Sequence, residues 1–385
     1  MIRFLTAGES HGKGLVVVLE GFPANLPLSA GDVDFELARR QMGYGRGGRM
    51  KIEKDRIEIL SGVRKGLTLG GPIALAVWNK DYENWVNVMA PEPGPDAGRH
   101  LTRPRPGHAD FGGGIKYAQH DLRNILERAS ARETAMRVAA GAVAKKLLSL
   151  FGMQVQSHVV GLGPVTAKPF SAYPGDMNAR ADRSVVRMLD KNAEKKAIRA
   201  IDRSTVQGDT LGGIFEVIGT GFPPGLGSHV QWDRKLDGRL AQALMSIQAV
   251  KGVAFGRGFE NAALPGSLVH DEIAWSRSKG FHHLHNHAGG VEGGMTNGEP
   301  IVIRVAKKPI ATLKKPLRSV DVVTRKPQKA GYERSDVCAV PAASVIGEAV
   351  CAWVLADAFL EKTGGDHLEE IKNHWKATLR LQEKY

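Results

Sequence analysis

The chain has 385 residues, of which 42% are hydrophobic and 24% charged, an ordinary globular composition that disfavours disorder, collagen-like repeats and a coiled coil. The formal net charge of +13 creates a positive field that attracts nucleic acid, a membrane surface or a multiply charged metabolite. The N-terminal residues include no apolar stretch of signal-peptide length, and no run approaches the ~18 apolar residues of a membrane helix. We therefore expect a cytoplasmic protein without membrane contact.

Six short segments predict strands, one of them fully apolar and therefore buried, and no internal repeat or flexible linker divides the chain. The clearest is Leu-Val-Val-Val-Leu at 15–19, between Gly14 and Gly21. The others cover 57–60, 73–77, 155–160, 214–218 and 301–305. We expect one continuous domain over residues 1–364.

Three helices are predicted by apolar spacing and by their end signals. Residues 236–247 place leucines at helical spacing, with Asp233 as the expected N-cap and Gly252 just beyond the end. An Ala-rich helix is predicted over 133–150. A third covers 341–362, with proline at its start and glycine after its end. The Ala and Gly content implies close helix packing.

The mixture of helices and strands lacks strict βαβ alternation, which favours an α+β sandwich over a doubly wound sheet. Residues 365–385 are charged and favour either an extra helix or a loosely held tail. Cys338 and Cys351 lie on or beside a predicted helix, so we expect reduced, buried thiols and no disulfide framework.

The first segment that could carry chemistry is Gly-Glu-Ser-His-Gly-Lys-Gly at 8–14. Glycines on both sides of Ser10 and His11 let backbone and imidazole approach a ligand, and histidine exchanges protons near neutral pH. The alternative is a polar turn without a catalytic role.

The second segment, residues 39–50, is rich in arginine and glycine and includes Arg40, Arg46 and Arg49. Such segments cradle phosphate or carboxylate through backbone N–H groups and guanidinium forks. It is neither a Walker loop nor a dinucleotide fingerprint. The alternative is RNA contact, although Arg-Gly tracts that bind RNA are usually long and disordered.

The third segment, Arg-Pro-Arg-Pro-Gly-His-Ala-Asp at 103–110, fixes His108 beside Asp110, a carboxylate that could orient the ring. A surface histidine is the alternative. In the fourth segment, 128–135, Ser130 and two arginines precede the Ala-rich helix, a combination typical of an anion site.

Near the C-terminal end, a glycine-rich stretch at 289–298, the Lys-Lys-Pro-Ile-Ala-Thr at 307–312 and the Arg-Ser-Asp at 334–336 could form another phosphate pocket with a carboxylate. Four histidines lie between 282 and 287: His282, His283, His285 and His287. Their alternate spacing suggests a metal site, but no partner group stands at a comparable spacing, so solvent-facing or ligand-edge histidines are favoured and we expect no metal.

In order and over nearly the whole chain, these segments resemble the chorismate synthase family. The resemblance rests on Gly-Glu-Ser-His-Gly, Arg-Pro-Gly-His-Ala-Asp, Ser-Ala-Arg-Glu-Thr-Ala and Arg-Ser-Asp before Pro341. It implies a catalytic domain over 1–364 folded as one large β-α-β sandwich, and a homotetramer. It also implies the conversion of 5-enolpyruvylshikimate 3-phosphate to chorismate by a 1,4-anti elimination of phosphate, in the shikimate pathway of aromatic amino acid biosynthesis. The reaction requires reduced FMN without net redox change.

The resemblance also implies roles for single residues. Substrate contacts fall on Arg40 and Arg46, with Arg49 and Arg132 as weaker candidates. Flavin contacts fall on Arg128, Ala129, Ser130, Gln248, Ala249, Gly293, Lys308, Pro309, Ile310, Ala311, Thr312 and Arg334. By hypothesis, His11 protonates the departing phosphate and His108 keeps the flavin correctly protonated, while Asp336, with Ser10, handles the proton at flavin N5.

The chain departs from the family pattern at a few positions. Ala129 stands where serine is common, and the four histidines replace a stretch that is often rich in Arg and Asn. The sequence leaves open whether the protein reduces its own flavin with NADPH or depends on a separate flavin reductase. A nucleic-acid-binding protein and a flavin- or nicotinamide-dependent oxidoreductase are the rival interpretations; with aromatic residues at only 6%, we expect no nucleic acid partner.

Overall fold

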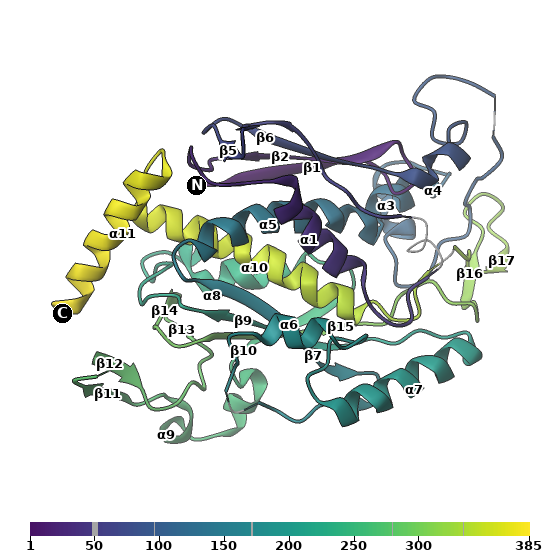
Figure 1. Cartoon of the computed structure of the whole chain (residues 1–385). Helices are drawn as coiled ribbons and strands as arrows, with labels where there is room; N and C mark the ends of the chain where they lie inside the picture. Colours follow the sequence, from purple (N-terminus) through teal and green to yellow (C-terminus); the bar gives the residue numbers. More distant parts are fainter. Residues whose placement is uncertain (48–52, 96, 171, 279, 334) are drawn as a thin grey trace.

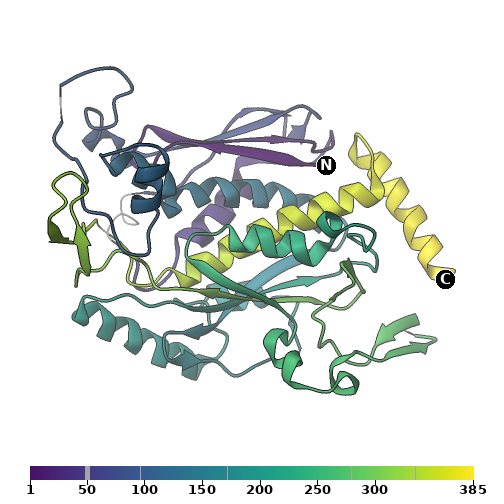
Figure 2. The ribbon, with the colours of Figure 1, turned by 180° about the vertical axis from the view of Figure 1, so that it is seen from behind.

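Two antiparallel sheets enclose a layer of helices in the computed structural model, which describes residues 1–47, 53–95, 97–170, 172–278, 280–333 and 335–385 (Figures 1 and 2). The first sheet has the order β1-β2-β6-β3 and the second the order β10-β15-β9-β7-β8. Their strands are β1 Arg3–Ala7, β2 Gly14–Glu20, β3 Glu58–Ser61, β6 Ile73–Trp78, β7 Gln154–Leu162, β8 Val165–Thr166, β9 Gly213–Thr220, β10 Val250–Phe255 and β15 Ile301–Lys307. The predicted α+β sandwich is confirmed.

The layer between the sheets is formed by α1 Ala30–Gln41, α5 Thr134–Ser149, α8 Leu236–Met245 and α10 Val340–Thr363. α10 contacts strands and helices on all sides, and an apolar surface around a whole helix is typical of a buried position. By length and composition α10 could also cross a membrane, which the sequence analysis did not expect, but 94% of its apolar window is buried inside the protein. It is therefore the core helix of the sandwich.

Smaller elements surround these three layers. They are β4 Val63–Arg64, β5 Leu67–Thr68, α3 Asp110–Lys116, α4 Arg123–Ala129, α6 Met177–Asp182, α7 Lys191–Gln207, α9 Gly266–Val269, β11 Ile273–Ser276, β12 Gly280–His283, β13 Val291–Glu292, β14 Met295–Thr296, β16 Arg318–Val320, β17 Pro327–Lys329 and α11 Leu368–Glu383. The region after Gly364 thus contains a helix, α11, whose Trp375 packs edge-on against Phe359 of α10. Both cysteines are free and buried, as predicted.

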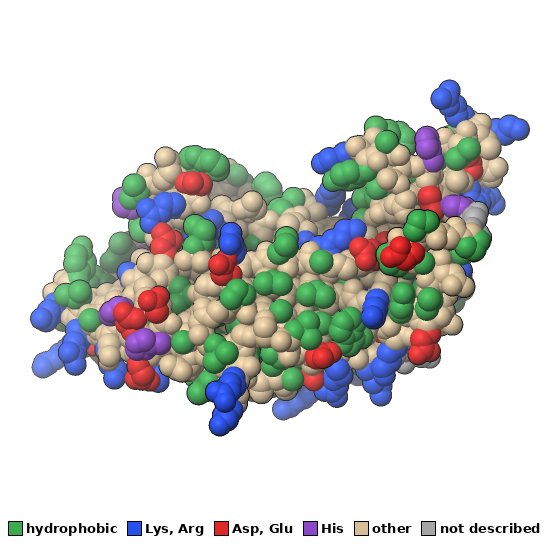
Figure 3. Space-filling view, turned by 90° about the horizontal axis from the view of Figure 1, so that it is seen from above, with side chains coloured by type: hydrophobic (Ala, Val, Ile, Leu, Met, Phe, Trp, Pro, Cys, Tyr) green, Lys and Arg blue, Asp and Glu red, His purple; other side chains and the backbone are tan. Residues whose placement is uncertain are grey.

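All six predicted strands are confirmed, but β2 is buried on one face only. Leu15, Val17 and Leu19 are fully buried against the helices, whereas Val18 on the opposite face is 41% exposed. The same outer face carries exposed Leu5 and Trp78. Seen from above, hydrophobic and uncharged side chains cover the middle of the molecule, while Lys and Arg project mainly from its rim (Figure 3). An apolar face of this kind is typical of a protein interface.

The helix over 236–247 forms as α8, but its predicted end signals are wrong. Asp233 belongs to a separate 3-10 turn, Trp232–Arg234, and α8 begins after Lys235, which makes no side-chain cap. The helix ends at Met245 with Ser246 as its C-cap, and Gly252 lies inside β10. Asp233 satisfies the residue preference of a cap, but it lies within the turn, and Lys235 occupies the N-cap position instead.

Gly141 shows how closely the Ala-rich helix α5 packs on α10. A Cβ atom at Gly141 would lie 2.4 Å from the Cα of Ala349. We therefore expect Gly141→Ala to destabilise the protein by about 1–3 kcal/mol, because two backbones would have to separate. Urea denaturation measures the loss. The matched control is Gly238→Ala in α8, where an added Cβ meets no atom within 4 Å; it should be neutral or slightly stabilising. Equal effects at both positions would contradict this account.

Candidate active site

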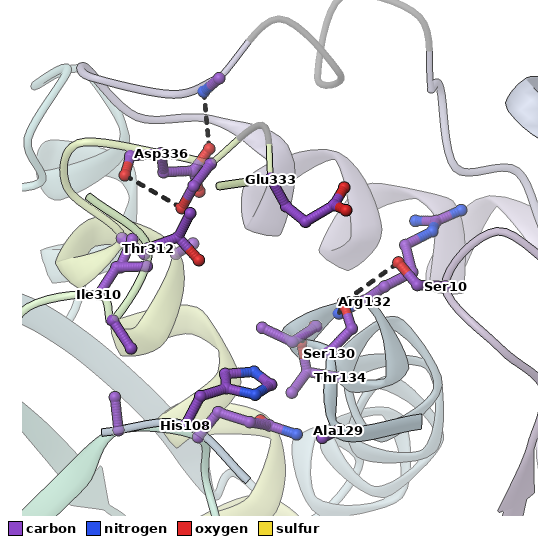
Figure 4. Close-up of a pocket in the computed structure, with 18 of the residues that line it drawn as sticks. Ser10, His108, Ala129, Ser130, Arg132, Thr134, Ile310, Thr312, Glu333 and Asp336 are labelled. Atoms are coloured by element: carbon purple, nitrogen blue, oxygen red, sulfur yellow. Dashed lines mark hydrogen bonds between the residues drawn. The ribbon is translucent and has the colours of Figure 1, made fainter. Parts of the chain in front are cut away.

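A cavity of about 400 Å³ opens where the first sheet, α4, the start of α10 and the end of β15 meet. It gathers four N-terminal sequence segments and two C-terminal ones, which lie far apart in the chain (Figure 4). The predicted site residues that line it are Ser10, His11, Arg40, Arg46, His108, Ala129, Ser130, Arg132, Gln248, Ala249, Lys308, Ile310, Ala311, Thr312 and Asp336.

Several predicted residues lie elsewhere. The Arg128 guanidinium is exposed and donates to the backbone oxygens of Thr6 and Gly8. Gly293 forms the turn between β13 and β14, outside the described cavity lining. Pro309 is exposed between two lining residues. Arg49 and Arg334 lie outside the described residues.

The turn that carries Ser10 and His11 is held in place by glycine and by Asn79. Gly8 has a φ of +105°, and a Cβ there would lie 2.3 Å from the Gly14 oxygen, so glycine is required. The Asn79 amide donates to the backbone oxygens of Glu9, Ser10 and Gly12. The turn therefore presents His11 in one position.

A buried carboxylate holds the His11 ring. Glu127 on α4 lies 2.8 Å from His11 Nδ1 and also accepts from the His11 backbone N–H at 2.7 Å. Trp85 stacks on the ring with centroids 4.0 Å apart. Burial opposes ionisation of Glu127, but its hydrogen bonds with His11 and the nearby Arg123 charge outweigh burial and hold the pKa of this carboxyl below its usual value.

Asp110 holds the second histidine, as the sequence predicted. His108 Nδ1 lies 2.6 Å from Asp110 Oδ1, and Arg105 donates to the other oxygen at 2.8 Å. Burial opposes ionisation of Asp110, yet these two partners keep its pKa well below the usual range. Arg105 also donates to the Thr312 hydroxyl at 2.9 Å, which leaves the Thr312 O–H available as a donor toward the cavity.

Asp336 is held by two groups from the segment 39–50, which is rich in arginine and glycine and is called the Arg-Gly segment below. Arg46 lies 3.1 Å from one carboxylate oxygen, and the backbone N–H of Gly47 donates to the other at 2.6 Å (Figure 4). Gly47 permits this approach, because a Cβ there would lie 3.0 Å from the Ser335 oxygen. The Arg-Gly segment therefore contributes to the site by holding a carboxylate as well as by offering positive charge.

Arg40 and Arg132 form a buried cationic wall of the cavity. Both contact Asp55, Arg132 at 2.6 Å and Arg40 at 3.4 Å. Burial, together with the charges of Arg132 and Arg46, lowers the pKa of Arg40 to about 10 despite the opposing effect of Asp55. Arg132 also lies 3.8 Å from Glu53, so these two arginines are balanced by two carboxylates. The excess of positive charge comes from the lining as a whole, where Arg40, Arg46, Arg105, Arg132, Lys307 and Lys308 outnumber Glu333 and Asp336, and it suits an anionic ligand.

Sequence reasoning missed several side chains that line the cavity or hold its lining in place, including Glu127, Trp85, Arg105 and Lys307. Arg105 lies within one of the predicted segments and Glu127 directly beside another, so their position in the sequence could have identified them as site residues. Trp85 had no motif, and its stacking on His11 depends on the loop after β6. Lys307 was noticed only as part of a Lys-Lys pair.

The four histidines between 282 and 287 lie around the β11–β12 hairpin, away from the described cavity lining. His283 contacts Glu292 at 3.1 Å, and His285 stacks on His287. Among the described residues, no group of three or more His, Cys, Asp or Glu side chains is placed to hold a metal ion.

Two carboxylate-held histidines that face a cationic cavity define an enzyme that binds a small anionic molecule and transfers protons. The comparisons with known proteins agree. The model of the family described as chorismate synthase matches residues 2–360. The chorismate synthase of Moorella thermoacetica is 59% identical over 377 residues, covering 98% of both chains. That of Thermus thermophilus is 59% identical over 373 residues, covering 96% of this chain and 97% of the other.

A solved structure entitled "Crystal Structure of Chorismate Synthase" superposes with a TM-score of 0.82 at 48% identity, covering 100% of this chain and 99% of that chain. The chain belongs to the chorismate synthase family. The fold predicted from the resemblance is thereby confirmed.

Proposed function

We infer that the protein is a carbon–oxygen lyase that converts 5-enolpyruvylshikimate 3-phosphate to chorismate by a 1,4-anti elimination of phosphate. The observation that carries this function is the meeting of His11 and His108, each held by a buried carboxylate, in one cationic cavity of a chain from this family. The substrate brings a phosphate and carboxylates, so a positively charged lining favours its binding. Its contacts are Arg40 and Arg46, with Arg132 and Arg49 in support.

Reduced FMN is the proposed cofactor, and the residues of the cavity fit it. The buried Oε1 of Gln248 has no hydrogen-bond partner among the described residues, which is expected of an acceptor that awaits a ligand. Ile310, Ala311 and Ile346 provide an apolar wall for a ring, and Lys308 and Thr312 suit a phosphate. Ala129, Ser130 and Ala249 complete the proposed contacts within the cavity, and Arg128, Gly293, Pro309 and Arg334 remain candidates outside its described lining.

The proposed proton transfers follow from the positions of the side chains. His11 protonates the departing phosphate, because it lines the cavity and Glu127 holds its ring in place. His108, oriented by Asp110, keeps the flavin correctly protonated. Reduced FMN, when bound, supplies the N5 atom that takes the substrate hydrogen without net redox change. Asp336, with Ser10, then transfers the proton at flavin N5. The hydroxyl of Ser10 lies 3.2 Å from the hydroxyl of Ser130.

We also propose the domain boundaries, the cellular location, the assembly and the reductant of the enzyme. Residues 1–364 form the catalytic domain and 365–385 a C-terminal extension built on α11. The enzyme works in the cytoplasm as a homotetramer, and the exposed apolar face around Leu5, Val18 and Trp78 supports association between copies. The reductant is either NADPH acting through the protein itself or a separate flavin reductase.

An anaerobic assay tests the function. We expect 5-enolpyruvylshikimate 3-phosphate with dithionite-reduced FMN to give chorismate and phosphate in equal amounts, and oxidised FMN to give neither. Chorismate absorbance and released phosphate are followed together. Net oxidation of the substrate would indicate an oxidoreductase and contradict the proposal. Tight FMN binding without product would reject the proposed substrate. Salt-sensitive RNA binding without any response to FMN would favour a nucleic-acid-binding protein instead.

A further inference from the structure

Lys307 is a partly buried amine at the edge of the cavity. Neither the proposed mechanism nor the proposed ligand contacts assign it a role. It ends β15 and continues the strand face that carries Ile303 and Val305, which are at most 1% exposed. Alternate residues of a strand share a face, so the Lys307 side chain enters the same interior. Where the apolar residues end, Lys307 lines the cavity.

The surroundings of Lys307 do not balance its positive charge. Its Nζ donates to the backbone oxygen of Gln248 at 3.3 Å, the only hydrogen bond that this amine makes among the described residues, although an ammonium has three donors. The residues opposite it in the sheet, Gly213 on β9 and Val250 on β10, are uncharged. Donor capacity is therefore left over at this point of the cavity.

The charged and titratable groups that act on Lys307 come from its own segment and from two others. They are Lys308 beside it, Arg46 after α1, and Asp336 and the Cys338 thiol before α10. Asp336, the one carboxylate among them, is already held by Arg46 and by the Gly47 N–H. Burial is the largest influence and lowers the pKa of Lys307 to about 8.

We propose that Lys307 contacts an anionic oxygen of the bound flavin and takes up a proton from solvent when the flavin binds. The inference rests on the proposed FMN cofactor. Lys307 lies between Gln248 and Lys308, both assigned to the flavin, and an apolar side chain would fill its position without the cost of burying an amine. The anionic oxygen belongs either to the phosphate or, in the reduced flavin, to the ring.

The expected pH dependence follows from the two states of the amine. An anionic partner raises the pKa of Lys307 in the complex above its value of about 8 in the free protein. Below pH 8 the amine is already protonated, so it adds no pH dependence. Above pH 8 binding requires proton uptake, and the affinity falls until the pKa of the complex is passed. The loss should reach about tenfold between pH 7.5 and pH 9.

Anaerobic absorbance titrations with dithionite-reduced flavin between pH 7 and 9.5 test the proposal, with anaerobic calorimetry in two buffers of different ionisation enthalpy to count protons. Lys307→Met should weaken FMN binding by about tenfold at pH 7.5, and should abolish both the proton uptake and the loss of affinity above pH 8. Lys307→Arg should bind FMN well and without pH dependence, because arginine stays protonated. Lys308→Met, the matched neighbour, should keep the pH dependence.

Riboflavin distinguishes the two sources of negative charge. A loss of affinity in Lys307→Met for both flavins assigns the contact to the ring, and a loss confined to FMN assigns it to the phosphate. The proposal is overturned if Lys307→Met, folded by circular dichroism, matches the wild type in affinity and proton uptake, or if only Lys308→Met removes the pH dependence. A wild-type protein that binds no FMN would instead overturn the cofactor.

Discussion

His11→Ala and His108→Ala should each lower kcat by about 10²–10⁴-fold in the anaerobic assay with reduced FMN supplied. Each histidine is held by a buried carboxylate, at 2.8 Å for His11 and 2.6 Å for His108, so each replacement removes a positioned proton donor or acceptor. KM should change less than kcat, because a proton transferred during the reaction contributes little to binding of the ground state. Initial rates of chorismate formation over a range of substrate concentrations measure both quantities.

The control for this pair is His285→Ala. His285 is exposed near the β11–β12 hairpin and is not among the described residues that line the cavity, so its removal should leave kcat within a factor of two or so of wild type. Near-normal turnover in His11→Ala and His108→Ala would reject the assigned roles. An equally large loss in His285→Ala would show that the effect is not specific to the cavity.

Glu348→Ala should destabilise the protein by about 3–5 kcal/mol, the largest effect on stability that we expect. Glu348 lies fully buried in α10, where Arg39 binds both its oxygens at 2.8 and 2.9 Å and Lys145 contacts it at 2.9 Å. Arg187 and Ser157 also donate to it. Without the carboxylate these buried cations lose their shared partner, and the cost of burying them is no longer offset.

The free energy of unfolding in urea, measured at a fixed protein concentration, tests this expectation. Glu369→Ala is the matched control: its ion pair with Lys372 is exposed on α11, so its loss should change stability by no more than about 0.5 kcal/mol. A loss below 1 kcal/mol in Glu348→Ala would mean that water or a rearranged partner replaces the carboxylate.

Strands and helices could be predicted where a local signal decides them. The apolar run at 15–19 forms β2. Pro341 and Gly364, which were expected to mark the ends of the third helix, lie at the two ends of α10. The start of α8 could not be predicted, because Asp233 lies within a separate 3-10 turn and the helix begins only after Lys235. The exposed outer face of β2 could not be predicted either, since a run of valines does not reveal which side is covered.

The site was predictable in its parts and less so in its connections. The segments around His11, His108 and Asp336 were each recognised, and the structure brings them to one cavity. Only for His108 does the orienting carboxylate lie two residues away. The partner of His11 is Glu127, 116 residues distant, and a sequence does not say which of 40 acidic residues meets a given histidine.

The route of the chain through the sandwich has a consequence for how the enzyme is made. Cavity residues run from Ser10 to Ile346, and Ile346 belongs to α10, the helix that both sheets enclose. Near the N-terminus, the backbone N–H of Ile2 bonds to Asp357 of the same helix. A ribosome must therefore release nearly all of the chain before the pocket closes, and the early strands must wait for their last partner. Active enzyme should thus appear only once synthesis of the chain is almost complete.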